Sequence, residues 1–439
     1  MSKSRREFIA EAALLGAGLA AFPSLLLRAA QSAATAGKTG RQFVLVFLRG
    51  AADGLNICVP YGDPDYYRLR PSLAIPPPGR GSANKPAALK LNDLFALHPA
   101  LAPLLPLYQA GELAFVHAVG SPQPTRSHFD AQDYLGLGTP GRRATETGFL
   151  TRALTPRHPA APLTAVAFGP QTPACLRGFH AAIAGSRLDA LVDRSRGADA
   201  AQTALAKMYG AGAAGKNAGP ADSAGAMHAE NSARGEFAYG DGADDLLRAS
   251  AEAGGAAVAE LRRVLEKSPP GAGYGRGPVS EGFRQLAQVI KADAGLQAGS
   301  VDIGGWDHHS NESARLDRGL GDLAAALRAF RDDLGARLDK TCVVVVTEFG
   351  RMAKENGAGG SDHGHGSLAL VLGGGVRGGR VHGRWPGLRD QDLYDGRDLA
   401  ATTDFRDLLS DCLGSQFGPL PAELFPGYKT SGRTGLFSI

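Results

Sequence analysis

The chain has 439 residues, of which 44% are hydrophobic and 21% are charged. This composition supports a large buried core, so it excludes a wholly disordered protein and predicts one or two large domains. Lysine and arginine total 47 against 43 for aspartate and glutamate, which gives a net charge of +4 without a basic cluster. The even balance argues against a nucleic acid as the partner.

Residues 1–36 have the features of a twin-arginine export signal. Arg5 and Arg6 precede a mildly apolar run over 9–27, and small residues suited to a signal peptidase follow it. An N-terminal membrane anchor is the alternative, but charged and helix-weakening residues interrupt the run. We therefore expect a periplasmic or secreted mature chain over 37–439, with the twin-arginine translocation machinery as a partner and no later transmembrane segment.

The four cysteines are widely separated and show no CxxC spacing, which excludes a zinc ribbon or a dithiol redox motif. One or two disulfides remain open in an oxidising compartment. Cys342 opens an apolar strand, so we expect a buried thiol there.

Apolar runs in the first part of the mature chain predict strands of an α/β fold. The run 43–48 is continuously apolar, which is typical of a central parallel strand covered on both faces. A helix is expected over 101–108, shortened or kinked by its two prolines. Further strands are expected at 113–116 and 163–168.

Residues 197–245 are dominated by Ala, Gly, Ser and Asp. Few large apolar side chains are present to offset the entropy lost on ordering this backbone, so the segment is predicted to be a flexible surface insertion. Two amphipathic helices are expected after it, near 246–265 and 282–290.

The clearest unit of the chain is a strand, a helix and a second strand. Strand 300–303 is followed by a helix with apolar residues at three- and four-residue steps from Leu316 to Leu338, and then by strand 342–346. This order is a βαβ crossover, which predicts a parallel sheet with helices on both faces. Later apolar runs predict two more strands and a last helix, at 368–372, 379–381 and 404–413.

Residues that carry chemistry gather beside the predicted strand ends. Ligands of open parallel sheets lie at the carboxyl ends of the strands, where the connecting loops converge. A mixture of aspartate and histidine in glycine-rich loops suits Zn²⁺, Mn²⁺ or a similar ion, and two ions side by side are chemically plausible. The residues beside these strand ends are Asp53, Asp307, His308, His309, Glu348, Asp362, His363 and His365.

Five strings in the chain resemble those of one bacterial family of twin-arginine-exported proteins. They are FLRGAADGLN at 47–56, RSHFDAQD at 126–133, GGWDHH at 304–309, TEFGR at 347–351 and DHG at 362–364. The family is known only as domain of unknown function 1501, and it is placed in the alkaline phosphatase-like superfamily with sulfatases and cofactor-independent phosphoglycerate mutases. The resemblance covers roughly 42–413 apart from the insertion. It implies an alkaline phosphatase-like α/β fold with a mostly parallel sheet.

The resemblance also implies metal ligands. Asp53 matches an aspartate that lies between two ions, and Asp307 and His309 match a pair that serves one ion. His363, or else His365, resembles a late histidine ligand. Zn, Mn, Mg and Ca all remain open as the one or two divalent ions.

Three further positions complete this comparison. Asp362 stands beside the late histidine ligand. Glu348 replaces a common Asp-His pair, so a second ion would be held less well, and a simple ion pair with Arg351 is the alternative. The family usually has Thr where His308 stands, so His308 is not expected to be a ligand.

The same resemblance implies attack on phosphorus or sulfur by a hydroxyl near a helix start. Ser127 is the candidate nucleophile and Thr125 the reserve, although Ser127 also fits a helix cap. His128 is a candidate acid or base, and an ordinary packed histidine is the alternative. A formylglycine sulfatase is disfavoured because no Cys-x-Pro-x-Arg is present.

Two functions follow as expectations. The first is an exported metal-dependent hydrolase or transferase that acts on small anionic phosphate or sulfate esters. The second is a catalytically silent, metal-stabilised binding protein of the cell envelope. The replacement at Glu348 and the capping alternative for Ser127 favour the second.

Overall fold

The computed structural model describes residues 40–143, 145–156, 161–169, 171–179, 182–190, 192, 256–430 and 434–438. The expected export signal at 1–36 and the expected insertion at 197–245 lie outside them. Within the described part of the chain, no helix combines the length and apolar character needed to cross a membrane.

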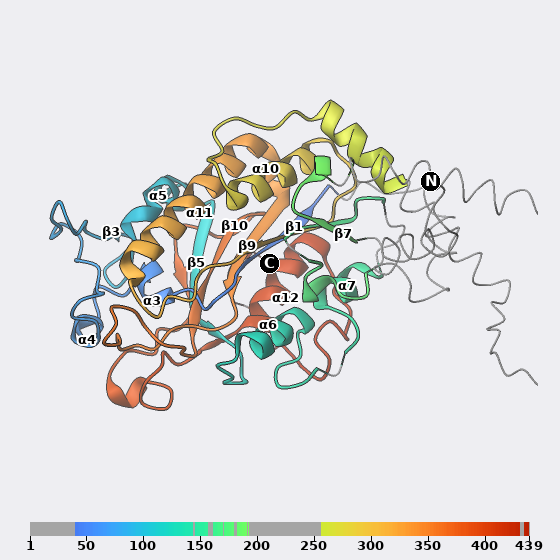
Figure 1. The fold of residues 1–439 in the computed structure, drawn as a ribbon. Helices are drawn as coiled ribbons and strands as arrows, with labels where there is room; N and C mark the ends of the chain where they lie inside the picture. Colours follow the sequence, from blue (N-terminus) through green and yellow to red (C-terminus); the bar gives the residue numbers. More distant parts are fainter. Residues whose placement is uncertain are drawn as a thin grey trace, which may run out of the picture.

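A nine-stranded sheet runs through the centre of the molecule (Figure 1). Its order is β11-β5-β10-β9-β1-β8-β6-β7, and β12 pairs with β5. The strands are β1 Gln42–Leu48, β5 Leu113–Gly120, β6 Ala165–Phe168, β7 Ala182–Gly185, β8 Ala298–Ile303, β9 Thr341–Thr347, β10 Ser367–Gly373, β11 Val381–His382 and β12 Thr403–Asp404.

Strand β1 is central, as its continuous apolar run predicts, because it pairs in parallel with β8 on one side and β9 on the other. Leu48 at its end lies level with Ile303 of β8 and Thr347 of β9. The βαβ order from β8 to β9 is confirmed, with β1 between the two strands. This common register brings the loops that follow all three strands to one edge of the sheet.

Strand β10 makes the sheet mixed, because it runs antiparallel to both β9 and β5. The expectation of a mostly parallel α/β sheet is therefore confirmed in its coarse form only. Since β10 runs the other way, it begins at the edge where its parallel neighbours end. The residues just before it, including His363, consequently reach the same edge.

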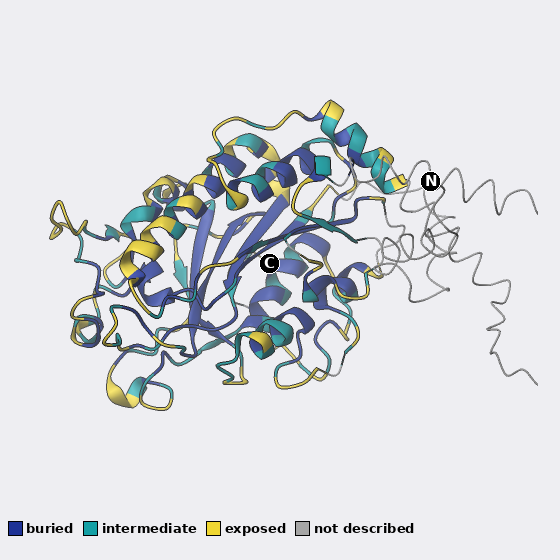
Figure 2. Ribbon diagram, in the orientation of Figure 1, coloured by how far each residue is buried: buried dark blue, intermediate teal, exposed yellow. Residues whose placement is uncertain are grey.

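Helices cover both faces of the sheet, as the βαβ unit predicts (Figure 1). One face packs against α10 and α11, and the other against α7 and α12, with α6 on that same side. Figure 2 shows the buried side of each helix turned toward the sheet. Their bounds are α6 His128–Leu137, α7 Phe149–Leu154, α10 Pro278–Lys291, α11 Glu312–Leu334 and α12 Phe405–Phe417.

Shorter elements complete the described chain. The helix expected over 101–108 is confirmed in shortened form, as the 3-10 helix η1 Pro99–Leu104 followed by α5 Leu105–Gln109. A small sheet has the order β2-β4-β3, and a further helix spans 256–267. The remaining elements are α3 Gly54–Ile57, β2 Cys58–Val59, α4 Pro64–Leu69, β3 Leu89–Lys90, β4 Ala96–Leu97, η2 Ala174–Leu176, η3 Gly335–Lys340 and η4 Asp390–Asp392. All four cysteines are buried free thiols, so the expectation for Cys342 is confirmed.

Candidate metal centre

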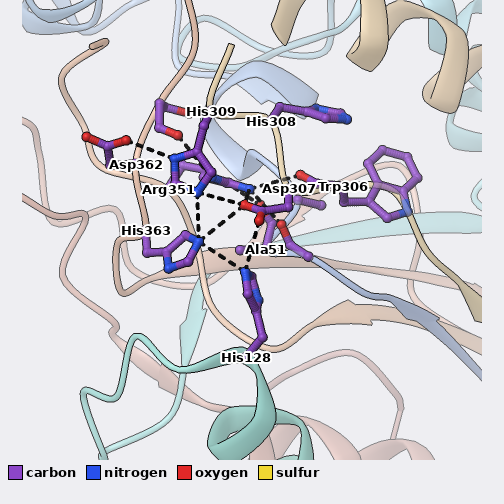
Figure 3. Close-up of polar contacts among 12 residues, drawn as sticks. Ala51, His128, Trp306, Asp307, His308, His309, Arg351, Asp362 and His363 are labelled. Atoms are coloured by element: carbon purple, nitrogen blue, oxygen red, sulfur yellow. Dashed lines mark hydrogen bonds and ion pairs between the residues drawn. The ribbon is translucent and has the colours of Figure 1, made fainter. Parts of the chain in front are cut away.

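Three histidines and an aspartate converge at the edge of the sheet where the parallel strands end (Figure 3). Asp307 and His309 lie in the loop after β8, His363 lies just before β10, and His128 is the first residue of α6. Ligand atoms of His128, Asp307 and His363 all lie within 4.8 Å of one another, close enough to hold one metal ion. We call these three residues together with His309 the metal cluster.

The imidazole Nε2 atoms are the centre of this cluster. Nε2 of His363 lies 3.0 Å from Nε2 of His128 and 3.0 Å from Nε2 of His309. The Asp307 carboxylate lies 3.0 Å from His309 Nε2 and 3.2 Å from His363 Nε2. Nε2 of His363 therefore lies next to both other rings and beside the Asp307 carboxylate.

The opposite nitrogen of each ring, Nδ1, contacts an oxygen that can only accept a hydrogen bond. These contacts are His128 to Glu348 Oε1 at 2.8 Å, His309 to Asp362 Oδ1 at 2.9 Å and His363 to the main-chain oxygen of Arg126 at 2.9 Å. The N–H of each neutral ring is thereby placed on Nδ1, which leaves a lone pair on each Nε2. Metal-bound histidines are usually held in this way, so the donor set fits a cation.

Arg351 ties the three loops of the cluster together. Its guanidinium is buried and donates to main-chain oxygens of Gly50, Ala51, Trp306 and Ser361, at 2.7 to 3.1 Å. It also donates to Asp307 Oδ1 at 2.6 Å. Partial burial by itself raises the pKa of Asp307, but the Arg351 guanidinium and the nearby histidines lower that pKa to about 2. Asp307 is therefore ionised and ready to bind a cation.

Two glycines allow these loops to approach each other closely. A Cβ atom on Gly50 would lie 2.6 Å from the main-chain nitrogen of Asp307, and its φ of +119° disfavours other residues. A Cβ atom on Gly364 would lie 2.3 Å from the carbonyl carbon of Arg351. The glycine-rich character of the loops is thus a packing requirement of the site.

Glu348 lies behind the metal cluster, where it supports His128. Its side chain is fully buried, and Oε1 accepts from Gly50 N at 2.8 Å and Gln132 Nε2 at 3.0 Å as well as from His128. Burial raises the pKa of Glu348, but the hydrogen bonds from His128 and Gln132 outweigh it and leave the pKa lowered. The bond to Glu348 in turn raises the pKa of His128. Arg351 pairs with Asp307, so the alternative of a simple Glu348–Arg351 pair is wrong.

Ser127 occupies the N-cap of α6. Its Oγ accepts from the main-chain N–H of Asp130 at 3.4 Å, and Thr125 Oγ1 accepts from Ser127 N at 3.2 Å. The next residue, His128, points its ring into the metal cluster (Figure 3). The structure therefore brings an imidazole, and not either candidate hydroxyl, into contact with the other ligands.

Three other candidates lie outside the metal cluster. Asp53 is buried in an ion pair with Arg70. The ring of His365 stacks on Tyr394 with centroids 4.4 Å apart. His308 is turned away from the cluster, with Nε2 2.8 Å from the main-chain oxygen of Gly305 (Figure 3).

The cluster is open to solvent on one side. The side chains of Asp307 and His309 are 44% and 45% exposed, whereas those of His128 and His363 are 22% exposed. A small molecule can therefore approach from the side of Asp307 and His309.

Sequence reasoning missed part of this arrangement. His128 was expected to act as an acid or base, and nothing in its spacing from the other ligands indicated that it joins them. The roles of Arg351 and Gln132 depend on contacts between distant loops and were not expected either. The RSHFDAQD string was the available signal, since it contains both His128 and Gln132.

The chain matches a family model described as "Protein of unknown function (DUF1501)" over residues 41–420. The chain belongs to the DUF1501 family. The match covers most of the chain, including every residue of the metal cluster. No curated protein matches this DUF1501 chain.

Proposed function

We propose that this DUF1501 chain is a metal-dependent hydrolase that cleaves phosphate or sulfate esters. The observation that carries the proposal is the convergence of three imidazole Nε2 atoms on the Asp307 carboxylate. Three histidines with one carboxylate suit Zn²⁺ or Mn²⁺ better than Mg²⁺ or Ca²⁺, which prefer oxygen ligands throughout.

The chain's own residues position the reactants. A bound divalent ion supplies Lewis acidity, which polarises an ester oxygen and makes a nearby water more acidic. Glu348 and Asp362 fix the orientation of two rings, and Arg351 fixes Asp307. The solvent-facing side of the cluster admits the ester.

Water is the attacking group that this arrangement supports best. The hydroxyl of Ser127 caps α6, and that of Thr125 accepts from a main-chain N–H. The water oxygen adds to phosphorus or sulfur, the bond to the alcohol oxygen breaks, and the alcohol leaves with a proton from the water. This step needs no oxidant and no covalent intermediate on the chain.

Export through the twin-arginine machinery is part of the proposal. Arg5 and Arg6 ahead of a mildly apolar run support it. That route carries folded proteins, which suits a chain that acquires its metal before export. The mature protein is then periplasmic or secreted.

A catalytically silent, metal-stabilised binding protein of the cell envelope is the second candidate. The engagement of Ser127 in the helix cap favours it, because no candidate side-chain nucleophile faces the metal cluster among the described residues. In that case the metal ion would stabilise the loops without turnover.

The test is metal content by mass spectrometry together with a screen of phosphate and sulfate esters, on the purified mature chain. We expect bound Zn or Mn and ester turnover in the wild type, and loss of both in His363→Ala. The matched control is His382→Ala, since His382 lies on β11 and bonds to Arg377. Absence of metal after attempted reloading would contradict the proposal. Retained metal without any turnover would support the silent binding protein.

A further inference from the structure

Arg315 lies beside the metal cluster and is exposed to solvent. It belongs to the start of α11, the helix that begins at Glu312. Its Nη1 donates to the main-chain oxygen of Asp307 at 3.4 Å. Asp307 therefore has two roles, because its carboxylate belongs to the metal cluster while its carbonyl oxygen holds a guanidinium next to that cluster.

Most N–H donors of Arg315 face water. The bond to Asp307 is long for an N–H to oxygen contact, which is usually about 2.9 Å. Among the described residues it is the one hydrogen bond of this side chain, and no described carboxylate pairs with Arg315. An arginine carries several N–H donors and stays protonated at every physiological pH. The guanidinium can therefore bind an anion from solution without giving up a stronger contact.

The other arginines that border the metal cluster bond to carboxylates of the chain. The pairs are Arg49 with Asp302, Arg126 with Asp398, Arg351 with Asp307 and Arg397 with Asp398. A ligand would have to compete with these carboxylates for the guanidinium groups. At Arg315 it would displace water.

Arg315 contacts the cluster on its accessible side. Asp307 and His309 are the two members of the metal cluster whose side chains are most exposed, and Arg315 bonds to the first of them. The carbonyl oxygen and the carboxylate of one aspartate are separated by only a few bonds, and the side chain of arginine is long and rotates freely in solvent. A group that binds the cluster from this side is within reach of the guanidinium.

A guanidinium suits the oxygens of a phosphate or sulfate group. Its planar N–H groups form charge-assisted hydrogen bonds, often to two oxygens at once. A tetrahedral ester that binds the cluster through one oxygen still has other anionic oxygens, which take no part in bond breaking. These non-reacting oxygens are the groups that Arg315 can bind.

We propose that Arg315 is a substrate-binding residue that holds the non-reacting oxygens of a phosphate or sulfate ester. This inference rests on the proposed function. Arg315 forms no covalent bond and transfers no proton in this role. Because the contact is the same before and during the reaction, it lowers KM and leaves kcat nearly unchanged.

The first arm of the experiment measures anion binding directly, by calorimetry with inorganic phosphate and separately with sulfate, on the mature protein after loading with zinc. Arg315→Gln is expected to weaken the binding of at least one of these anions about fivefold or more. Arg315→Lys keeps the charge without the planar fork, so it is expected to lose less. Metal content by mass spectrometry is expected to match the wild type in both variants.

Arg318→Gln is the matched control. Arg318 lies three residues further along α11, is exposed, and likewise pairs with no described carboxylate. We expect this variant to bind both anions as the wild type does. An equal loss of affinity in Arg318→Gln would indicate a general effect of charge and overturn the inference. Unchanged affinity in Arg315→Gln, loss of its metal, or a wild type that binds neither anion would overturn it as well.

The second arm measures KM and kcat with p-nitrophenyl phosphate and p-nitrophenyl sulfate. For the ester that the wild type hydrolyses, Arg315→Gln is expected to raise KM about fivefold and to change kcat less than about twofold. Added salt is expected to raise KM more in the wild type than in the variant, because salt screens an exposed contact between charges. A lower kcat at unchanged KM would contradict a role in binding.

The two proposals fail in different ways. Turnover of an ester with the same KM in the wild type and Arg315→Gln would overturn the inference while the hydrolase function stands. Anion binding that depends on Arg315, without turnover of any ester, would overturn the hydrolase function. In that case the anion site remains, as part of a silent binding protein.

Discussion

Nε2 of His128 lies 3.0 Å from Nε2 of His363, while Nδ1 of each ring contacts an oxygen acceptor. Two imidazole lone pairs at this distance repel each other unless a cation or an added proton lies between them. A divalent ion bound by both rings and by Asp307 removes this repulsion. Metal binding is therefore expected to stabilise the folded chain as well as to supply chemistry.

Removal of the metal ion is expected to lower the melting temperature. A ligand that binds only the folded state stabilises it by about 4 kcal/mol when its free concentration is a thousand times Kd. Calorimetry on chelated and reloaded protein measures the difference. His363→Ala is expected to melt like the chelated wild type and not to respond to metal, whereas His382→Ala responds as the wild type does. Equal melting temperatures for chelated and reloaded wild type would contradict this prediction.

Substitution of Glu348 is expected to weaken metal binding although this residue does not belong to the metal cluster. Loss of the partner of a metal-bound histidine typically reduces affinity about 10- to 100-fold. Glu348→Ala should show this loss in competition titrations with a chelating dye. Glu348→Gln should lose less, because its amide oxygen still accepts from His128 Nδ1. Wild-type affinity in Glu348→Ala would show that His128 needs no support.

Ser127→Ala separates a helix cap from a nucleophile. Removal of an N-cap side chain costs about 1 kcal/mol of stability. We expect that loss in urea denaturation, with kcat unchanged because water attacks the ester. Ser127→Asn is the matched control, since asparagine restores the cap without supplying a hydroxyl. A kcat that falls a hundredfold or more in both variants would assign the attack to Ser127.

His117 is expected to make the free energy of unfolding depend on pH. Its Nε2 lies 3.0 Å from the main-chain oxygen of Cys58, and its Nδ1 accepts from Ala118 N, so the buried ring is neutral. Burial lowers the pKa of His117 from 6.5 to about 4. The unfolded chain therefore binds a proton below pH 6.5 that the folded chain does not, and stability falls as the pH decreases from 6.5 to about 4.

The size of this effect is at most about 3 kcal/mol, from about 1.4 kcal/mol for each unit of pKa difference. Urea denaturation of the wild type and of His117→Gln across this pH range isolates it, because the other titrating groups are the same in both proteins. The variant is expected to lose less stability on acidification. Parallel curves for the two proteins would show that His117 is protonated as easily in the folded chain as in the unfolded one.

Much of the fold could be predicted from local patterns. Two apolar patterns predict burial directly, because exposure of those side chains to water is costly. They are the continuous apolar run of β1 and the three- and four-residue spacing in α11. The convergence of Asp307, His309 and His363 could be predicted for a related reason. They stand beside strand ends, and parallel strands in common register bring such residues to one edge.

Other features depend on the direction of a strand or on the packing of a side chain, and no short stretch of sequence predicts either. The apolar run of β10 is compatible with either strand direction, so only the assembled sheet shows that it is antiparallel. Ser127 and His128 are adjacent, and the first turn of α6 decides that the imidazole faces the metal cluster while the hydroxyl caps the helix.

The sequence by itself determined the α/β class, the central strand and most of the candidate ligands, since these follow from periodicity and from position along the chain. Only the tertiary structure decided which charges meet. Arg70 pairs with Asp53 although α3 and β2 separate them along the chain. Arg351 pairs with Asp307 although α11 and β9 separate them. The partner of each carboxylate is the cationic group that lies nearest to it in space, and that distance is set by the packing of the whole sheet.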